Sequence, residues 1–357
     1  MTVTRPDSPG LRLAADAGVH AMPLPTPFPV GPVNTWLVDD DPLTLVDTGP
    51  TGADALWALE QALADHGRRI EDLQRIVLTH EHADHVGLTA LLQERSGAEV
   101  VALDRLAPRL TELEGHGRRE AGFLATAAAA HGLPDPGVDA LAALHLSHHA
   151  WAGRSVADVT PVAEDDEVAF ADRRLRVVHR PGHSTTDTLL VDEDRGIVIG
   201  GDHLLGHVPS VPLLTARPEA LRPDAHPATA GDRAPALPRY LDGIRRTAAD
   251  DPAVVLGGHG TPVTDVATLV ATRVRSAERR ARRILGLLDP DERATAYDLA
   301  GRLWGDVARR QVVLCLSETL GSLDLLAAAG DVATESVAGD GDDASGRDGT
   351  LIVWRRT

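Results

Sequence analysis

The sequence predicts an α/β fold of packed sheets and helices, followed by a small helical domain with a two-stranded wing. Strand-like and helix-like segments alternate through the first hundred residues, which is typical of layered α/β domains. Strand-like segments resume after residue 165, and several of them end in glycine. Beyond residue 265 the pattern changes to helices and a hairpin. We therefore expect a catalytic domain over 1–264 and a second domain over 265–357.

The first half of the chain contains the clearest alternation. Residues 33–47 read as two short strands around an Asp-Pro turn, and 54–67 has the apolar spacing of a helix that ends in glycine. Residues 68–79 lead into a strand, 87–97 again has helical spacing with a terminal glycine, and 99–103 is a short apolar strand.

The middle of the chain combines two irregular insertions with further strands. Residues 105–160 are alanine-rich and helical, and strands are expected within 167–182, 188–202 and 253–260. Between the last two lies a proline-rich segment, 208–238. A segment of this length without periodicity is more often a loop that lines a site than part of a scaffold.

The C-terminal segment has the order of elements of a winged helix. A linker helix over 265–288 precedes helices over 295–304 and 317–329, and strands at 332–337 and 350–356 form a hairpin. Winged helices usually bind nucleic acid through a basic helix and wing. Here residues 317–349 carry eight acidic side chains and one basic one. We therefore expect nucleic-acid binding to be unlikely and the domain to serve packing or homodimer formation.

Composition excludes several classes of function. The chain contains no lysine, so a lysine nucleophile or Schiff base is impossible, and the net charge of −18 argues against polyanionic partners. Cys315 is the only cysteine, which rules out an intrachain disulfide. No run approaches the roughly 18 apolar residues of a membrane span, and no secretory signal is visible. These features predict a cytoplasmic protein without a membrane partner.

The run His-Glu-His-Ala-Asp-His at residues 80–85 is the strongest chemical signal. It follows a predicted strand and precedes a helix, which is where sites in α/β proteins are usually built. His80, His82, Asp84 and His85 provide the nitrogen and oxygen ligands that transition metals prefer. Three later residues, His183, Asp202 and His259, also follow an apolar strand and a glycine. The sequence therefore offers seven candidate metal ligands at strand ends.

These motifs together resemble the metallo-β-lactamase superfamily over roughly residues 20–265, with Asp47 as the first of five ordered motifs. The resemblance implies a four-layer αββα sandwich and a dinuclear metal site. It implies that His80, His82 and His183 hold one metal, that Asp84, His85 and His259 hold the second, and that Asp202 bridges them. Asp47 would orient the ligand loop without touching metal.

The implied chemistry is metal-dependent hydrolysis. A water held between two divalent cations loses a proton near neutral pH and attacks a carbonyl or phosphoryl centre. Asp84 is both a ligand and a candidate proton shuttle to the leaving group. Zinc is the expected metal, with iron or manganese as alternatives. Glu81 and Ala83 are expected to act as spacers, with Glu81 in solvent.

The substrate class is narrowed by departures from other members of the superfamily. An aspartate at position 202 and the missing signal argue against a dedicated β-lactamase, and the short spacing from His183 to Asp202 leaves no room for a large inserted nuclease domain. We expect a small ester, thioester or lactone. A phosphodiesterase or endoribonuclease, and a regulatory DNA-binding protein with a vestigial metal fold, remain alternatives.

Other histidines and a tryptophan lie near these motifs in sequence. His203 and His207 follow Asp202 and are candidates for substrate contact. A cluster in the helical insertion is a candidate lid or a set of surface positions: His145, His148, His149 and the adjacent Trp151.

Overall fold

The computed structural model describes residues 8–338 and 350–357. They form two compact units that are each discontinuous in sequence. The first holds the residues up to 114, 147–210 and 242–270, and the second holds 115–146, 211–241 and 271–357. Parts of the helical and proline-rich insertions thus belong to the second unit, because their apolar side chains share a core with the C-terminal helices. The predicted division into domains over 1–264 and 265–357 stays a prediction.

The first sheet of the first unit has the strand order β1-β2-β3-β4-β5-β6. Its strands are β1 (Val19–Leu24), β2 (Val33–Val38), β3 (Thr44–Val46), β4 (Arg75–Leu78), β5 (Glu99–Leu103) and β6 (Thr160–Val162). β3, β4, β5 and β6 run parallel, whereas β1 and β2 are antiparallel to their neighbours. The two edge strands were not predicted from the sequence. Each contains a proline, Pro23 or Pro161, which lowers strand propensity and is tolerated at a sheet edge.

The second sheet has the order β11-β10-β9-β8-β7. Its strands are β7 (Glu167–Ala169), β8 (Arg174–His179), β9 (Thr188–Asp192), β10 (Ile197–Gly201) and β11 (Val254–Gly257). β10 and β11 are parallel, and the other neighbours are antiparallel. The predicted strands within 167–182, 188–202 and 253–260 are confirmed.

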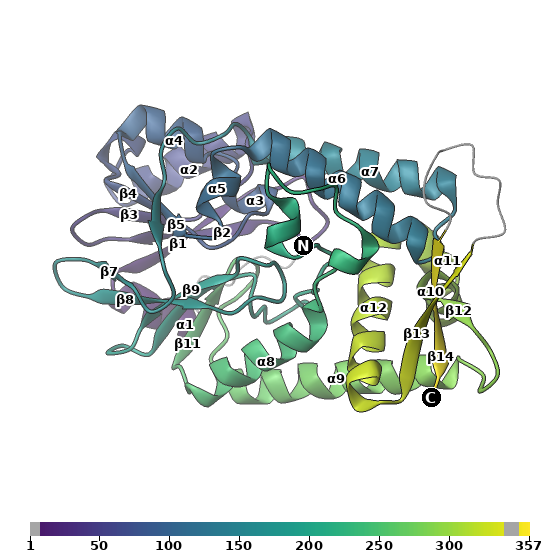
Figure 1. Cartoon of the computed structure of the whole chain (residues 1–357). Helices are drawn as coiled ribbons and strands as arrows, with labels where there is room; N and C mark the ends of the chain where they lie inside the picture. The colour runs from purple at the N-terminus through teal and green to yellow at the C-terminus, as the bar shows by residue number, and fades with distance from the viewer. Residues whose placement is uncertain (1–7, 339–349) are drawn as a thin grey trace. The chain divides into compact units, whose positions relative to one another are not determined.

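Helices flank these sheets, as the fold class predicts (Figure 1). They are α1 (Pro9–Asp16), α2 (Ala53–Asp65), α3 (Ala83–Val86), α4 (Thr89–Ser96) and α5 (Ala107–Leu110), with 3₁₀ turns η1 (Ile70–Asp72) and η2 (Ala150–Ala152). α1 contacts β1 and β11, α2 contacts β1, and α4 contacts β5. α2 buries Ala55, Leu59 and Leu63, whose four-residue spacing places them on one face.

The second unit contains most of the helical insertion and the C-terminal elements (Figure 1). The helices not yet named are α6 (Leu113–Ala130), α7 (Asp135–His149), α8 (Ala236–Ala249), α9 (Val266–Gly286), α10 (Ala296–Trp304), α11 (Asp306–Arg310) and α12 (Val312–Ala329), with turns η3 (Pro218–Leu221) and η4 (Ala230–Asp232). Of these, α6, α7, α8 and α9 have residues in both units. A small sheet has the order β12-β14-β13, from β12 (Ala294–Thr295), β13 (Val332–Ala338) and β14 (Thr350–Arg356).

The predicted C-terminal hairpin is confirmed, because β13 pairs with β14 in antiparallel register from Val332–Arg356 to Ala338–Thr350. The acidic segment that joins these strands, 339–349, lies outside the described residues. α12 begins earlier than predicted, and the identification of a winged helix stays a prediction. Two arginine–carboxylate pairs involve α12, namely Arg280 with Glu318 and Arg233 with Asp324.

α12 is the one helix among the described residues that is long and apolar enough to cross a membrane by length and composition. Half of that apolar window is buried inside the protein. Its Leu316, Leu320 and Leu323 lie in the core of the second unit. This burial accounts for the apolar composition of α12.

Replacing Leu323 by alanine should lower the free energy of unfolding by about 2–5 kcal/mol, because the side chain is fully buried and its removal leaves a cavity. Leu314 lies on the same helix but is 40% exposed. Leu314→Ala is therefore the matched control and should cost much less. Chemical denaturation of both variants measures the difference, and equal losses would contradict the packing of α12.

Candidate metal centre

The predicted ligands lie in loops that follow strands of the two sheets. Asp47 follows β3, the 80–85 run follows β4, and His183 lies in the loop after β8. Asp202 and His259 follow β10 and β11. All of these residues belong to the first unit, so residues that are far apart in sequence meet in one place.

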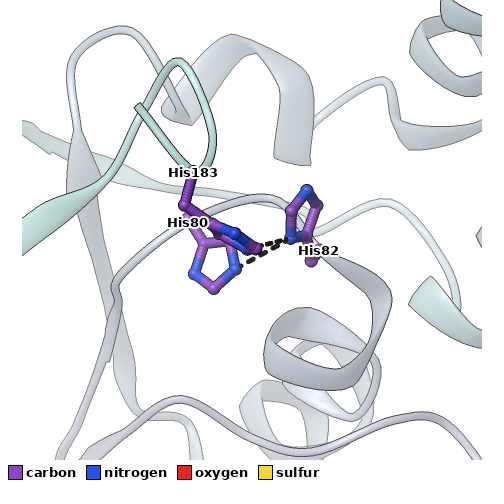
Figure 2. Close-up of side chains that lie close together, drawn as sticks. All are labelled: His80, His82 and His183. Carbon is purple, nitrogen blue, oxygen red and sulfur yellow. Dashed lines mark hydrogen bonds between the residues drawn. The ribbon is translucent and has the colours of Figure 1, made fainter. Parts of the chain in front are cut away.

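One group of ligand atoms consists of three histidine nitrogens. Nε2 of His80 and Nε2 of His183 lie 3.0 and 2.9 Å from Nδ1 of His82 (Figure 2). A neutral imidazole carries one proton on one of its two nitrogens, so His82 Nδ1 can donate to at most one of these partners. Such convergence of nitrogen lone pairs is typical of a metal site.

The second group combines histidines with carboxylates. Nε2 of His259 lies 3.2 Å from Oδ2 of Asp84, and Nε2 of His85 lies 4.0 Å from the other oxygen of Asp84. Asp202 lies between the two groups: its Oδ2 is 3.6 Å from Nε2 of both His183 and His259, and its Oδ1 is 3.5 Å from Nε2 of His85. The geometry thus brings together all seven predicted ligands.

Hydrogen bonds on the outer side fix the histidine tautomers. His85 Nδ1 donates to Asp47 Oδ2 over 2.8 Å, and His259 Nδ1 donates to the Pro32 carbonyl over 2.8 Å. The Thr79 hydroxyl donates to Asp47, so its oxygen accepts from His80 Nδ1 at 3.0 Å. Each of these histidines therefore directs Nε2 toward the centre. Such outer partners orient metal-binding histidines.

Burial and neighbouring charges perturb the pKa values within the centre. Burial, followed by the nearby histidines, lowers the pKa of His80 well below its usual value. Burial also opposes charge on His85, but Asp47, Asp202 and Asp84 together raise the pKa of that imidazole well above its usual value. Burial opposes charge on Asp202, yet His259 and His85 hold its pKa well below the usual range. Asp202 is therefore an anion at neutral pH.

The donor set fits divalent metal ions. Nε2 of His85, Oδ1 of Asp202 and Nε2 of His259 are buried and have no hydrogen-bond partner among the described residues. Buried polar atoms normally have a partner, and those without one call for an explanation such as an ion. At this centre, three groups of three side chains have ligand atoms within 4.8 Å of one another: His80–His82–His183, His80–His85–Asp202 and Asp84–His85–His259.

Metal binding should weaken as the pH falls, because a cation must displace the proton that the carboxylates hold on His85. His80, whose pKa is lowered, is already neutral and releases no proton. Zinc affinity should therefore fall between about pH 8 and about pH 6, and calorimetry in buffers of different ionisation enthalpy should detect proton release. A pH-independent affinity without proton release would contradict these protonation states.

Glycines next to the ligands permit close approach of the two sheets. A side chain at Gly258 would lie 2.4 Å from Oδ1 of Asp202 and 2.6 Å from His85. Gly201 has a φ of +48°, and a side chain there would lie 2.5 Å from the Thr79 hydroxyl. These positions therefore require glycine, which explains the glycine directly before Asp202 and the one directly before His259.

The expectation that Glu81 is a solvated spacer is wrong. It is buried and forms an ion pair with Arg109, and its other oxygen accepts from the Thr186 hydroxyl. Arg109 and Asn34 were not predicted from the sequence. Asn34 supports the His259 loop, since its amide donates to the carbonyls of Gly257 and Gly260. No local motif marks these partners, because they come from distant elements.

The other predicted histidines have different surroundings. His203 is fully buried beside Thr247, with 2.9 Å between Nε2 and the hydroxyl, and burial lowers its pKa to about 3. This supports a structural role. His207 is exposed, and its ring lies so close to Gly260 that a side chain there would be 2.1 Å from Nδ1. Its place next to the His259 loop leaves substrate contact by His207 as a prediction.

The histidines of the helical insertion do not share one environment. His145 lies 3.5 Å from Glu120, His148 packs edge-on against Phe28, and His149 is hydrogen-bonded to the Leu113 carbonyl. Trp151 is 38% exposed. A role of these side chains in a lid stays a prediction.

Comparison with known proteins agrees with this arrangement. Residues 28–259 match the model of the metallo-beta-lactamase superfamily. The chain is 32% identical over 313 residues to the "Probable metallo-hydrolase YqjP" of Bacillus subtilis (strain 168), covering 87% of this chain and 92% of that protein. It is 37% identical over 124 residues to a hydroxyacylglutathione hydrolase of Stenotrophomonas maltophilia (strain R551-3), covering 34% of this chain and 44% of that protein.

Two solved structures resemble nearly the whole chain. A metallo-beta-lactamase family protein from Thermus thermophilus aligns with a TM-score of 0.71 and 26% identity, over 95% of this chain and 99% of that one. A beta-lactamase domain protein from Burkholderia ambifaria aligns with a TM-score of 0.73 and 26% identity, over 95% and 92%. The likeness therefore includes both compact units.

Proposed function

Because the chain belongs to the metallo-beta-lactamase superfamily and is a metal-dependent hydrolase, we propose that it uses two zinc ions to hydrolyse a small ester, thioester or lactone. The observation that supports this most is Asp202, whose carboxylate lies between the two groups of ligand atoms. We further propose a cytoplasmic enzyme, in which homodimer formation involves the second unit.

The ligand roles follow from the side-chain contacts. His80, His82 and His183 would hold one metal ion, and Asp84, His85 and His259 the other, with Asp202 shared between them. When bound, the metal ions supply Lewis acidity and lower the pKa of water.

The chain's own side chains orient the reaction and move protons. Asp47 holds His85 through Nδ1, which keeps Nε2 directed inward. Asp84 Oδ2, 3.2 Å from His259 Nε2, is the carboxylate oxygen from which a proton can pass to a leaving group. These are the catalytic roles that we propose for Asp84 and Asp47, the second acting through orientation alone.

A small acyl substrate is favoured over a nucleic acid. The Stenotrophomonas maltophilia relative is named for hydrolysis of a hydroxyacylglutathione, which is a thioester. The net charge of −18 opposes approach of a phosphate backbone. An acyl thioester is therefore the first substrate class to test.

The test is a substrate panel with the full-length, zinc-loaded chain. Thioesters, carboxylic esters and lactones are compared with a phosphodiester and a single-stranded RNA under the same conditions. We expect kcat/KM to be highest for one of the three acyl classes. Hydrolysis of that substrate should stop when the metal is chelated and should return when zinc is added. His183→Ala, which lacks one ligand of the proposed site, is the control for contaminating hydrolases.

Faster cleavage of the phosphodiester or of RNA, lost in His183→Ala, would contradict the proposed substrate class. It would favour a metal-dependent phosphodiesterase instead. Activity on acyl substrates that survives both chelation and His183→Ala would contradict the metal mechanism itself.

A further inference from the structure

We propose that Arg109 is a positioning residue that ties together the two segments carrying His82 and His183. It would thereby set the metal affinity of the His80–His82–His183 group, an inference that rests on the proposed function. Arg109 lies in α5, which contributes no metal ligand to the proposed site.

Arg109 completes a network of hydrogen bonds between the segment that carries His82 and the segment that carries His183. Its Nη1 donates to Oε1 of Glu81, the residue between His80 and His82. Its Nη2 donates to the Thr185 hydroxyl over 2.7 Å, two residues after His183. The Thr186 hydroxyl donates to the second oxygen of Glu81. Glu81 and Arg109 together therefore join the loop after β4 to the loop after β8.

This hydrogen-bond network is buried, and the helix that carries Arg109 is packed in the core. Arg109, Glu81, Thr185 and Thr186 are all buried. The helix that carries Arg109 is held by Leu106 and Leu110, which are fully buried in the core of the first unit. Breaking a buried ion pair leaves an uncompensated charge, and the planar arginine fork reaches two partners from two separate nitrogens, whereas lysine has only one.

The loop that bears His183 is compact, so a shift at Thr185 should move the ligand. Ser184 donates its backbone N–H and its hydroxyl to Asp187, with the hydroxyl contact at 2.7 Å. This closes a short turn over residues 184–187. A displaced Thr185 would carry the whole turn, and His183 with it.

The second ligand group depends on other contacts. Asp47 orients His85, and the Pro32 carbonyl orients His259. The hydrogen bonds from Arg109 to Glu81 and Thr185 involve neither His85 nor His259, and Asp202 is shared by both groups. Loss of Arg109 should therefore weaken metal binding at His80, His82 and His183 (the histidine group) more than at Asp84, His85 and His259 (the carboxylate group).

Zinc titration against a chromophoric chelator tests this with the full-length chain. In an His259→Ala background, which keeps the histidine group, Arg109→Met should weaken zinc binding by about 10–100-fold, the range for outer partners of metal ligands. In an His183→Ala background, which keeps the other group, the same change should have little effect. Arg109→Lys should rescue part of the loss, because it restores the charge but not the two separate nitrogens that reach Glu81 and Thr185.

Two further variants separate the tether from charge and folding. Glu81→Gln/Arg109→Met removes both charges and should still weaken the histidine group. Thr185→Val removes one hydrogen bond and should cause a smaller loss of zinc affinity at the histidine group. This variant tests the inference if the others fail to fold. Arg95→Met is the matched control, because Arg95 forms a similar bridge between Glu60 and Glu71 at the surface.

If Arg109→Met, Glu81→Gln/Arg109→Met and Thr185→Val left zinc affinity unchanged in both the His259→Ala and the His183→Ala background, this inference alone would be overturned. The same loss at both groups would also overturn it, since the effect would then be general. A wild-type chain that takes up no zinc would contradict the proposed function and this inference together.

Discussion

Replacing Asp202 by alanine should reduce hydrolytic turnover by about 1,000-fold, because the carboxylate between the two ligand groups is lost. A catalytic metal contributes several kcal/mol of transition-state stabilisation, and each ~1.4 kcal/mol corresponds to a factor of ten in rate. Steady-state kinetics at saturating zinc measures the loss.

The control for Asp202→Ala is another buried aspartate in the neighbouring strand. Asp192 in β9 accepts from Arg195 and lies near Arg173, so its ion-pair partners are arginines rather than histidines. Asp192→Asn should lower stability but leave kcat close to wild type. Comparable loss of kcat in the two variants, or none in Asp202→Ala, would mean that position 202 does not hold the metals.

Substituting Asp47 by asparagine should weaken metal binding by about 10–100-fold and leave catalysis recoverable at high zinc. Asp47 accepts from His85 Nδ1, from the Thr79 N–H and from the Thr79 hydroxyl, so it acts through these groups. The asparagine amide has a single acceptor oxygen, so it loses either the contact at Oδ1 or the two contacts at Oδ2. Metal affinity and kcat at saturating zinc are measured in parallel.

Asparagine is the suitable change because Asp47 has a φ of +60°. Asparagine tolerates this left-handed backbone as aspartate does, whereas alanine would add strain. The effect of Asp47→Asn on kcat at saturating zinc should remain far below that of Asp202→Ala. A similar, zinc-insensitive loss in both would assign Asp47 a direct role at the metals.

Much of the fold could be predicted because the buried strands are apolar and are followed by glycine or by a residue of the site. The segments before Asp47, His80 and Asp202 have this pattern, and they form β3, β4 and β10. The edge strands β1 and β6 were missed because proline lowers their strand signal. The start of α12 was missed for another reason, since an apolar run does not mark where a buried helix begins.

The candidate ligands could be identified because metal chemistry concentrates rare residue types in short runs. The partners of those ligands could not. Glu81 looked like a solvated spacer because Arg109, its ion-pair partner, is 28 positions away along the chain. Asn34 is separated by 226 positions from Gly260, whose carbonyl it binds. Contacts of this kind depend on how the two sheets pack.

The division of the chain into two compact units could not be predicted from local sequence patterns. The predicted boundary at residue 265 assigns residues 115–146 and 211–241 to the catalytic domain, whereas both segments belong to the second compact unit. Their apolar side chains, including Phe123, Val138 and Leu221, instead share a core with Leu299 and Leu320. Amphipathic helices show which face is buried but not which partner covers it.

The most direct test of the central claim is elemental analysis of the full-length chain. It is purified without chelator and then dialysed against zinc followed by zinc-free buffer. We expect about two zinc ions per chain, and about one in His259→Ala, because a dinuclear site that loses a ligand of one group retains the other. No bound metal in the purified protein, and no uptake of zinc on dialysis, would contradict the assignment of His80, His82, Asp84, His85, His183, Asp202 and His259 as metal ligands.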